Sequence, residues 1–291
     1  MSCHKLISFL FFSFNLYFFS MFTFFLKKNF SDGWENFFFL ILQNVFPLVF
    51  GVAAYFAMRF VSQAMPVLQY PTLIVAAGIF SVIVFSCGMN AAKIANYGAA
   101  TFSLFFKSIK HVWKIGFSFG ALYAVALLML RFGISYYLGM FLNTGSSVGL
   151  LLTAVLSWFT LVCVIALQWF IPLYFLQDEN NFYKCLKKSF IVFFDNAGFS
   201  VLVFVYNCLL LVLSLIVFTL FPGVSGIVLS VTNALRLRLY KYDWLEEMNE
   251  KEPGFENDRD KRSEVPWDEL LAEDKETLGP LKLGRIIFPW K

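Results

Sequence analysis

The sequence predicts an all-α protein, a polytopic transmembrane helical bundle with six spans in its body. Three observations predict this fold class. Of the 291 residues, 59% are hydrophobic and only 14% are charged, which is too little charge to cover a soluble protein of this length. Long apolar runs alternate with short polar gaps, and Lys and Arg gather in every second gap. Such a distribution of positive charge is typical of a membrane protein with a fixed orientation.

The body of the chain contains six apolar runs that we expect to span. A transmembrane helix needs about 20 mainly apolar residues to cross a hydrocarbon core of about 30 Å. The predicted spans are Phe37–Met58, Thr72–Met89, Val112–Leu130, Val148–Leu176, Ala197–Phe221 and Gly223–Leu235. The last run is short, but Arg236 and Arg238 follow it and could extend it by placing their charged groups at the interface.

The first apolar run, Leu6–Leu26, leaves three interpretations open. It is a seventh span, or it precedes a true translation start at Met21, or it is a cleaved signal peptide. No small-residue cleavage site ends the run, which disfavours the third interpretation. The predicted domains are an N-terminal apolar segment (1–26), a transmembrane helical domain (27–243) and a charged cytoplasmic tail (244–291).

Positive charge lies almost entirely on one side of the predicted spans. Twelve basic residues fall in the gaps on that side, and two, Arg59 and Arg131, fall on the other. Cytoplasmic loops of membrane proteins carry the excess of Lys and Arg. We therefore expect both ends of the six-span body to face the cytoplasm.

Two cytoplasmic gaps, Phe102–Lys114 and Phe182–Phe194, are predicted to form amphipathic interfacial helices. Each combines a lysine stripe with a Phe-rich remainder, the pattern of a helix that lies in the headgroup plane. Their lysines are candidate lipid- or partner-facing residues: Lys107, Lys110, Lys114, Lys184, Lys187 and Lys188. The alternative is that both segments only lengthen the following span and mark the cytoplasmic side.

Side-chain amides within the apolar runs form a second set of candidates. Polar groups are costly in lipid and usually face the interior of the bundle. The candidate intramembrane polar contacts are Asn44, Gln168, Asn207 and Asn233. None of them is ionisable, so they favour interhelical hydrogen bonding over a proton relay.

The sequence lacks signatures of catalysis or cofactor binding. Its five cysteines show no C-x-x-C spacing and its two histidines, His4 and His111, are far apart, so we expect no metal site. Neither a P-loop nor a Gly-x-Gly-x-x-Gly motif occurs, so we expect no nucleotide cofactor. The prediction is a protein without enzymatic activity, cofactor or nucleic-acid partner.

The tail from residue 244 is rich in charge, with 13 acidic and 8 basic residues. Glu250–Glu264 is predicted to be a flexible linker. Pro266–Leu278 is predicted to form a short helix, because Pro266 stands near its start and Gly279 just after its end. The chain ends in the apolar sequence Ile286–Lys291, which we expect to dock on the protein itself or on a partner.

Several loosely spaced segments of the body match a known family. They are Gly33-Trp34-Glu35-Asn36, Phe105-Phe106-Lys107-Ser108-Ile109-Lys110, Pro172-Leu173-Tyr174-Phe175 with Asp178, and Lys187-Lys188-Ser189. Over about residues 21–244 the chain resembles the YesL-like family of bacterial inner-membrane proteins, whose biochemical role is not established. The resemblance implies a bacterial cytoplasmic (inner) membrane protein with an accessory role in carbohydrate uptake, and it supplies no catalytic residues. The acidic tail departs from the family pattern.

The expected function is therefore that of a non-enzymatic accessory or scaffold component linked to solute uptake. Its expected partners are the lipid bilayer and a membrane protein bound through the cytoplasmic tail. The alternative is a transporter or channel in its own right. Substrate, partner and oligomeric state are left open by the sequence.

Overall fold

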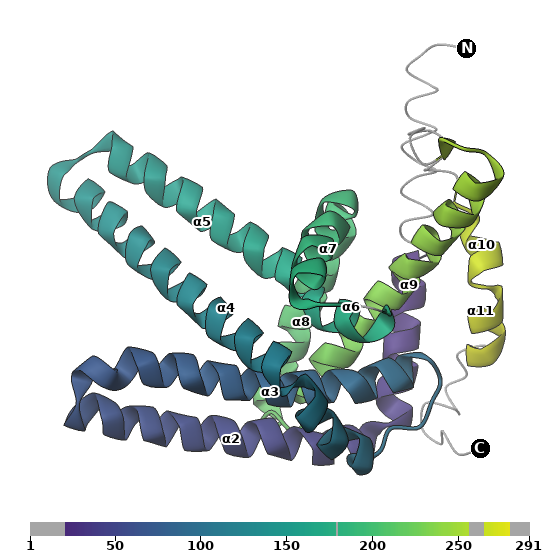
Figure 1. Cartoon of the computed structure of the whole chain (residues 1–291), viewed down its shortest axis with the longest axis horizontal. Coiled ribbons are helices and arrows are strands. Elements are labelled where there is room, and N and C mark those ends of the chain that lie inside the picture. Colours follow the sequence, from purple (N-terminus) through teal and green to yellow (C-terminus); the bar gives the residue numbers. More distant parts are fainter. Residues whose placement is uncertain (1–20, 179, 256–264, 280–291) are drawn as a thin grey trace, which may run out of the picture. The chain divides into compact units, whose positions relative to one another are not determined.

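The computed structural model of the chain describes residues 21–178, 180–255 and 265–279, and every regular element within these ranges is a helix (Figure 1). The chain divides into two compact units. Phe38–Thr232 form the larger unit, and Met1–Phe37 with Asn233–Lys291 form the smaller one. The predictions for Leu6–Leu26, for most of the linker and for Ile286–Lys291 concern residues outside the described ranges.

The larger unit begins with two antiparallel hairpins of long helices (Figure 1). The first consists of α2 (Phe37–Ala64) and α3 (Gln69–Ala95), joined by the short 3-10 helix η1 (Pro66–Leu68). Pro66 ends the first helix because a proline has no N–H for the helical ladder and restricts the residue before it. The exposed side chains of α2 are mostly apolar, as expected for a helix that faces lipid.

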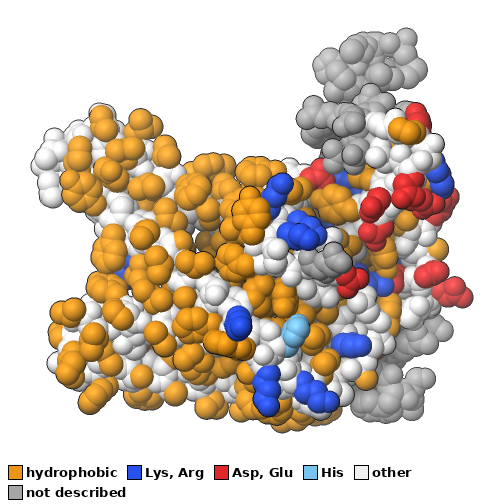
Figure 2. All heavy atoms as spheres, in the orientation of Figure 1, with side chains coloured by type: hydrophobic (Ala, Val, Ile, Leu, Met, Phe, Trp, Pro, Cys, Tyr) orange, Lys and Arg blue, Asp and Glu red, His pale blue; other side chains and the backbone are white. Residues whose placement is uncertain are grey.

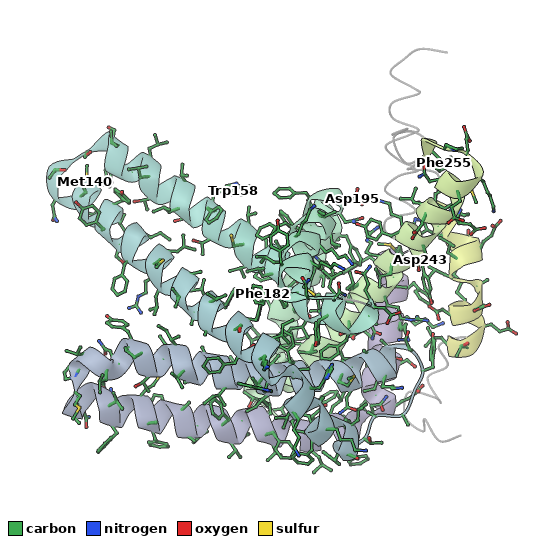
Figure 3. All side chains as sticks on the ribbon, viewed as in Figure 1. Met140, Trp158, Phe182, Asp195, Asp243 and Phe255 are labelled. Atoms are coloured by element: carbon green, nitrogen blue, oxygen red, sulfur yellow. The ribbon has the colours of Figure 1, made fainter. Side chains whose placement is uncertain are left out.

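The second hairpin consists of α4 (Phe102–Thr144) and α5 (Ser147–Leu167). Thr101 caps the start of α4 by accepting a hydrogen bond from the Leu104 N–H (3.2 Å). Gly145 ends α4 in the left-handed conformation (φ 68°), which glycine adopts without a steric penalty. Trp158, near the middle of α5, is 68% exposed and points away from the other helices (Figure 3).

Helix α4 corrects one expectation from the sequence. We expected Phe102–Lys114 to form an interfacial helix of its own, but it is the start of one uninterrupted 43-residue helix. Such a helix is about 65 Å long, at about 1.5 Å per residue, and therefore exceeds a hydrocarbon core of about 30 Å. No proline separates the amphipathic start from the apolar run, so the helical ladder continues through both. The alternative interpretation, a lengthened span, describes this segment.

The run Val148–Leu176, predicted as one span, contains a break. Helix α5 ends at Leu167, and α6 (Phe170–Leu176) begins after a short turn. Pro172 explains the position of the break, because its ring clashes with the carbonyl four residues earlier in a continuous helix. That carbonyl belongs to Gln168.

Helices α7 (Phe182–Asp195), α8 (Ala197–Ile216) and α9 (Gly223–Lys251) follow. Asn181 caps α7 by accepting a hydrogen bond from the Lys184 N–H (2.9 Å). Phe182 and Asp195 mark the two ends of this helix in Figure 3. Thus Phe182–Phe194 forms a separate helix, as expected, and the following apolar run forms α8.

Five helical segments among the described residues are long and apolar enough to cross a membrane. They are Phe37–Ala64, Pro66–Ala95, Phe102–Thr144, Ser147–Leu176 and Ala197–Ile216. These segments fit a membrane-embedded protein. The sixth predicted span, Gly223–Leu235, is only the first part of the 29-residue helix α9, whose remainder is highly charged, so the count of six spans stays a prediction.

The core of the larger unit lies at the ends of the helices rather than along their length. Phe85, Val112, Phe170 and Cys185 form one buried cluster, contributed by α3, α4, α6 and α7. Close contact between α3 and α4 depends on Gly120, because a Cβ at this position would overlap the Ala77 carbonyl oxygen. Small residues allow this kind of close approach between membrane helices.

The smaller unit contains the helical stretch 21–35, the end of α9 and two short helices, α10 (Trp267–Leu270) and α11 (Ala272–Leu278). The two short helices occupy the range for which the sequence predicts one helix. Asp268 and Glu269 lie in the first turn of α10, and Glu273 and Asp274 in the first turn of α11, where carboxylates favour the helix dipole.

Candidate functional site

The predicted intramembrane contact Asn44 holds the turn between α8 and α9. Its side-chain N–H groups donate to the carbonyl oxygens of Leu220 (3.0 Å) and Pro222 (2.8 Å), and its Oδ1 accepts from the Ser225 N–H (2.8 Å). Gly223 lies against the amide with φ 62°, and a Cβ there would overlap the Asn44 side chain. Asn44 thus satisfies backbone groups that a turn would otherwise leave without partners.

Gln168 joins the α5–α6 break to the start of α8. Its Nε2 donates to the Ser200 carbonyl oxygen (3.0 Å), and the neighbouring Trp169 donates through Nε1 to the Ser200 hydroxyl (3.1 Å). The Ser200 hydroxyl in turn donates to the Asn196 carbonyl oxygen (2.9 Å). These hydrogen bonds stabilise the helix break before Pro172. Their role is therefore structural.

The other two predicted amides have different surroundings. Asn207 is buried in α8, and its Oδ1 has no hydrogen-bond partner within the described residues. Asn233 belongs to the smaller unit, where its Nδ2 donates to Asn29 Oδ1 (3.3 Å). Asn44, Gln168 and Asn233 thus bind different partners, and none of their contacts joins two of the four predicted amides.

The three lysines predicted on the first basic stripe lie on an exposed face at the start of α4. Lys107, Lys110 and Lys114 are all exposed. Phe106 and Trp113, on the same part of the helix, are also exposed. The opposite side of this segment, including Phe105 and Val112, is buried. The face combines positive charge with exposed aromatic groups, which we call the α4 basic face.

The second stripe lies on α7 and is divided between two roles. Lys184 and Lys187 are exposed beside the apolar side chains of Tyr183, Ile191 and Phe194, and these five residues are the α7 basic face. Figure 2 shows Lys, Arg and His side chains among apolar ones over the start of α4 and over α7.

Lys188, by contrast, is half-buried. Its Nζ donates to Gln177 Oε1 (2.8 Å) and Asn180 Oδ1 (3.3 Å). The Asn180 amide also donates to the Leu173 and Gln177 carbonyl oxygens (2.7 and 3.0 Å). Lys188 therefore stabilises the connection after α6, where helical carbonyl groups need partners.

A charged cluster in the smaller unit was not predicted from the sequence. Arg236 on α9 binds the Asp274 carboxylate of α11 through both terminal nitrogens (2.8 and 3.2 Å), and the Tyr240 hydroxyl donates to the same carboxylate (3.2 Å). Lys28 and Asp32 form a buried ion pair (3.0 Å) in the stretch 21–35. We call these five residues the tail-docking cluster.

Burial shifts the protonation equilibria of this cluster. Desolvation lowers the pKa of Lys28 and raises the pKa of Asp32, although the attraction between the two charges opposes both shifts. Desolvation also raises the pKa of Tyr240 to about 12. In each case burial removes water from the charged form and disfavours it. The Tyr240 phenol is therefore neutral and can donate a hydrogen bond.

Only the Lys28–Asp32 pair of this cluster has a signal in the sequence. The sequence places Arg236 directly after an apolar run, where it is predicted to reach the membrane interface, and it predicts no role for Asp274. Arg236 and Asp274 lie 38 positions apart on separate helices, so helical periodicity does not relate them. Lys28 and Asp32 are four residues apart, which is the spacing of an ion pair on one helix face.

The residues described here offer no group of three or more His, Cys, Asp and Glu side chains that could hold a metal ion. Comparisons of the chain with protein-family models, with curated proteins and with solved structures find no match. The class that the fold itself defines is an all-helical protein with apolar helices that fit a membrane.

Proposed function

We propose that this chain is a non-enzymatic, multi-pass protein of the bacterial cytoplasmic membrane, with its C-terminus in the cytoplasm. Its role is that of an accessory or scaffold component linked to solute uptake, and carbohydrate is the solute class that the YesL-like resemblance implies. The α4 and α7 basic faces are the surfaces through which it binds a membrane-embedded partner and the surrounding headgroups.

The observation that carries this proposal is the exposure of aromatic side chains among lysines. Phe106 and Trp113 on α4 are 50% and 54% exposed, and Tyr183 and Phe194 on α7 are 72% and 68% exposed. Such a surface is too apolar for water and too charged for the hydrocarbon core, and it fits the membrane interface. Aromatic groups and cations are also the groups that anchor protein interfaces.

The polar groups of the spans support a structural role. Asn44 and Gln168 are engaged in hydrogen bonds to backbone groups. The five candidate spans contain no Asp or Glu. Intramembrane carboxylates are the usual groups of proton and ion relays, so these spans favour scaffolding over proton-coupled transport.

A photo-crosslinking experiment tests the proposal. The photoreactive residue p-benzoylphenylalanine replaces Tyr183 on the α7 basic face, and in a matched variant it replaces Leu151, an exposed residue of α5. We expect Tyr183 to yield a crosslink to a subunit of an uptake system, identified by mass spectrometry, and Leu151 to yield none. A third variant carries the photoreactive residue at Phe106 on the α4 basic face. If neither the Tyr183 nor the Phe106 variant formed a crosslink to another protein, the proposal would be contradicted.

The rival function, a transporter or channel in its own right, has a direct test. The purified full chain is placed in liposomes and the entry of labelled sugars is measured. The accessory role predicts entry no faster than into empty liposomes. Saturable uptake by the protein alone would establish the rival.

A further inference from the structure

The acidic C-terminal segment 265–279 docks on the middle of α9, at Arg236 and Tyr240, within the smaller unit. Asp274 is 3% exposed. Its carboxylate accepts hydrogen bonds from both terminal nitrogens of the Arg236 guanidinium and from the Tyr240 hydroxyl. Three donors on one carboxylate make a complete recognition site for an anion. A guanidinium that binds through two parallel N–H groups recognises carboxylate and phosphate in the same way.

The segment is acidic, and it also contacts a second arginine of α9. The segment contains five acidic residues and one lysine, Lys275, and Lys275 is paired with Asp268 of the same segment (2.6 Å). Figure 2 shows acidic side chains gathered over α10, α11 and the end of α9. The Arg238 guanidinium lies over the Trp267 ring (5.8 Å), which adds a cation–π contact.

The apolar anchoring of the segment is small. Val265 and Leu271 are its buried apolar side chains, whereas its other apolar residues, including Leu270, are partly exposed. Ordering fifteen residues has a large conformational cost, and two buried side chains compensate little of it. The polar contacts therefore have a strong influence on whether the segment is docked or released. They are the Arg236–Asp274 ion pair and the hydrogen bond from Lys27 Nζ to the Gly279 carbonyl oxygen.

The position of Arg236 on α9 indicates what competes with the segment. The apolar run Gly223–Leu235 ends at Arg236, and Arg238 and Lys241 follow on the same helix. Basic residues directly after a membrane-associated run attract anionic lipid headgroups, and changes of local charge release them. A headgroup phosphate whose charge is not neutralised by an ammonium group of the same lipid offers Arg236 and Tyr240 the same acceptor oxygens and charge as Asp274.

We propose that residues 265–279 form a reversible latch over an anion-binding site made by Arg236 and Tyr240. The Asp274 carboxylate is the internal occupant of this site, and the phosphate group of an anionic lipid displaces it. The latch is closed on a zwitterionic membrane and opens on an anionic one. This inference is independent of the docking surfaces on α4 and α7.

Hydrogen exchange of the full chain in nanodiscs tests the latch. Three samples are compared: phosphatidylcholine discs, discs that also contain phosphatidylglycerol, and phosphatidylcholine discs with inorganic phosphate. We expect peptides covering 265–279 to exchange at least tenfold faster in the phosphatidylglycerol discs. Release by inorganic phosphate as well would support the site and assign it to phosphate in general. Equal exchange in all three samples would overturn the proposal.

Single-charge variants separate the latch from general electrostatics. Arg236→Gln and Lys251→Gln each remove one positive charge from α9, but the exposed Lys251 pairs with the exposed Glu247 of the same helix (2.6 Å). In phosphatidylcholine discs we expect Arg236→Gln to release the segment and Lys251→Gln to leave its exchange unchanged. Equal effects of the two variants would overturn the proposal.

Two further variants distinguish release of the segment from misfolding of the whole protein. Asp274→Asn alters only the latch segment, and we expect it to release the segment while the exchange of α3 and α4 peptides stays at the wild-type rate. Exchanging the charges in Arg236→Asp/Asp274→Arg should restore protection in phosphatidylcholine discs. Protection that persists in Asp274→Asn would overturn the role of the carboxylate.

Discussion

Replacement of Asn44 by leucine is the perturbation that probes the larger unit most sharply. The substitution keeps the approximate size of the side chain but removes two donated hydrogen bonds and one accepted bond to the turn between α8 and α9. The Pro222 carbonyl oxygen keeps a second partner, the Gly226 N–H (3.0 Å). The Leu220 carbonyl and the Ser225 N–H therefore bear most of the loss.

The expected loss in the free energy of unfolding follows from the number of hydrogen bonds that the substitution removes. Side-chain hydrogen bonds in membrane proteins contribute about 0.6 kcal/mol on average and about 1.7 kcal/mol at most. Three bonds therefore contribute about 2 to 5 kcal/mol. The upper part of this range is expected, because buried backbone groups without partners add their own cost.

The neighbouring Gln43 provides a matched control. It lies on the same helix and is equally buried, but its Nε2 has no hydrogen-bond partner within the described residues. Gln43→Leu removes a buried polar group that is not satisfied, so we expect a neutral or stabilising effect. Both free energies of unfolding are measured by titration with sodium dodecyl sulphate in mixed micelles. If Asn44→Leu cost no more than Gln43→Leu, the assigned role of Asn44 would be refuted.

Three further results are expected. Gly120→Ala should destabilise the protein by about 1–3 kcal/mol through overlap with α3, whereas Gly139→Ala, with open space at its Cβ, should be neutral in the same titration. Asp32→Leu should cost about 3–5 kcal/mol by breaking the buried ion pair with Lys28, and adding Lys28→Met should recover most of that loss. Because burial raises the pKa of Tyr240 from 10.0 to about 12, its contribution to stability is fully present below about pH 10 and is lost as the pH rises through about 12. An absorbance titration at 295 nm should show this late ionisation, and Tyr240→Phe should lack it.

The helical hairpins could be predicted from the sequence because their signals are local. Apolar runs of sufficient length and the helix breaks at Pro66 and Gly145 each depend on a few adjacent residues. The caps Thr101 and Asn181 are also local signals, although the prediction did not use them. The break at Gln168 could have been found from Pro172, since the position four residues before a proline is where a helix is interrupted. The continuity of α4 matches the alternative interpretation, because an amphipathic pattern and an apolar run that no proline separates can share one helix.

The candidate sites were less predictable. The exposed positions of Lys107 and Lys184 follow from helical periodicity, but the hydrogen bonds of Lys188 to Gln177 and Asn180 depend on a turn whose path the sequence does not specify. Contacts such as Arg236 with Asp274 join distant elements, and their partners are set by tertiary packing. Local patterns cannot supply this information.

The central claim is that the basic gaps lie on one side of a membrane crossed by these helices. Single cysteines replace Leu142, near the α4–α5 turn, and Tyr183, on α7, in a variant without the native cysteines; both positions are highly exposed. A membrane-impermeant maleimide is applied to intact cells. The account predicts that Leu142→Cys is labelled from outside and that Tyr183→Cys is labelled only after the membrane is opened. Labelling of both positions from the same side would contradict it.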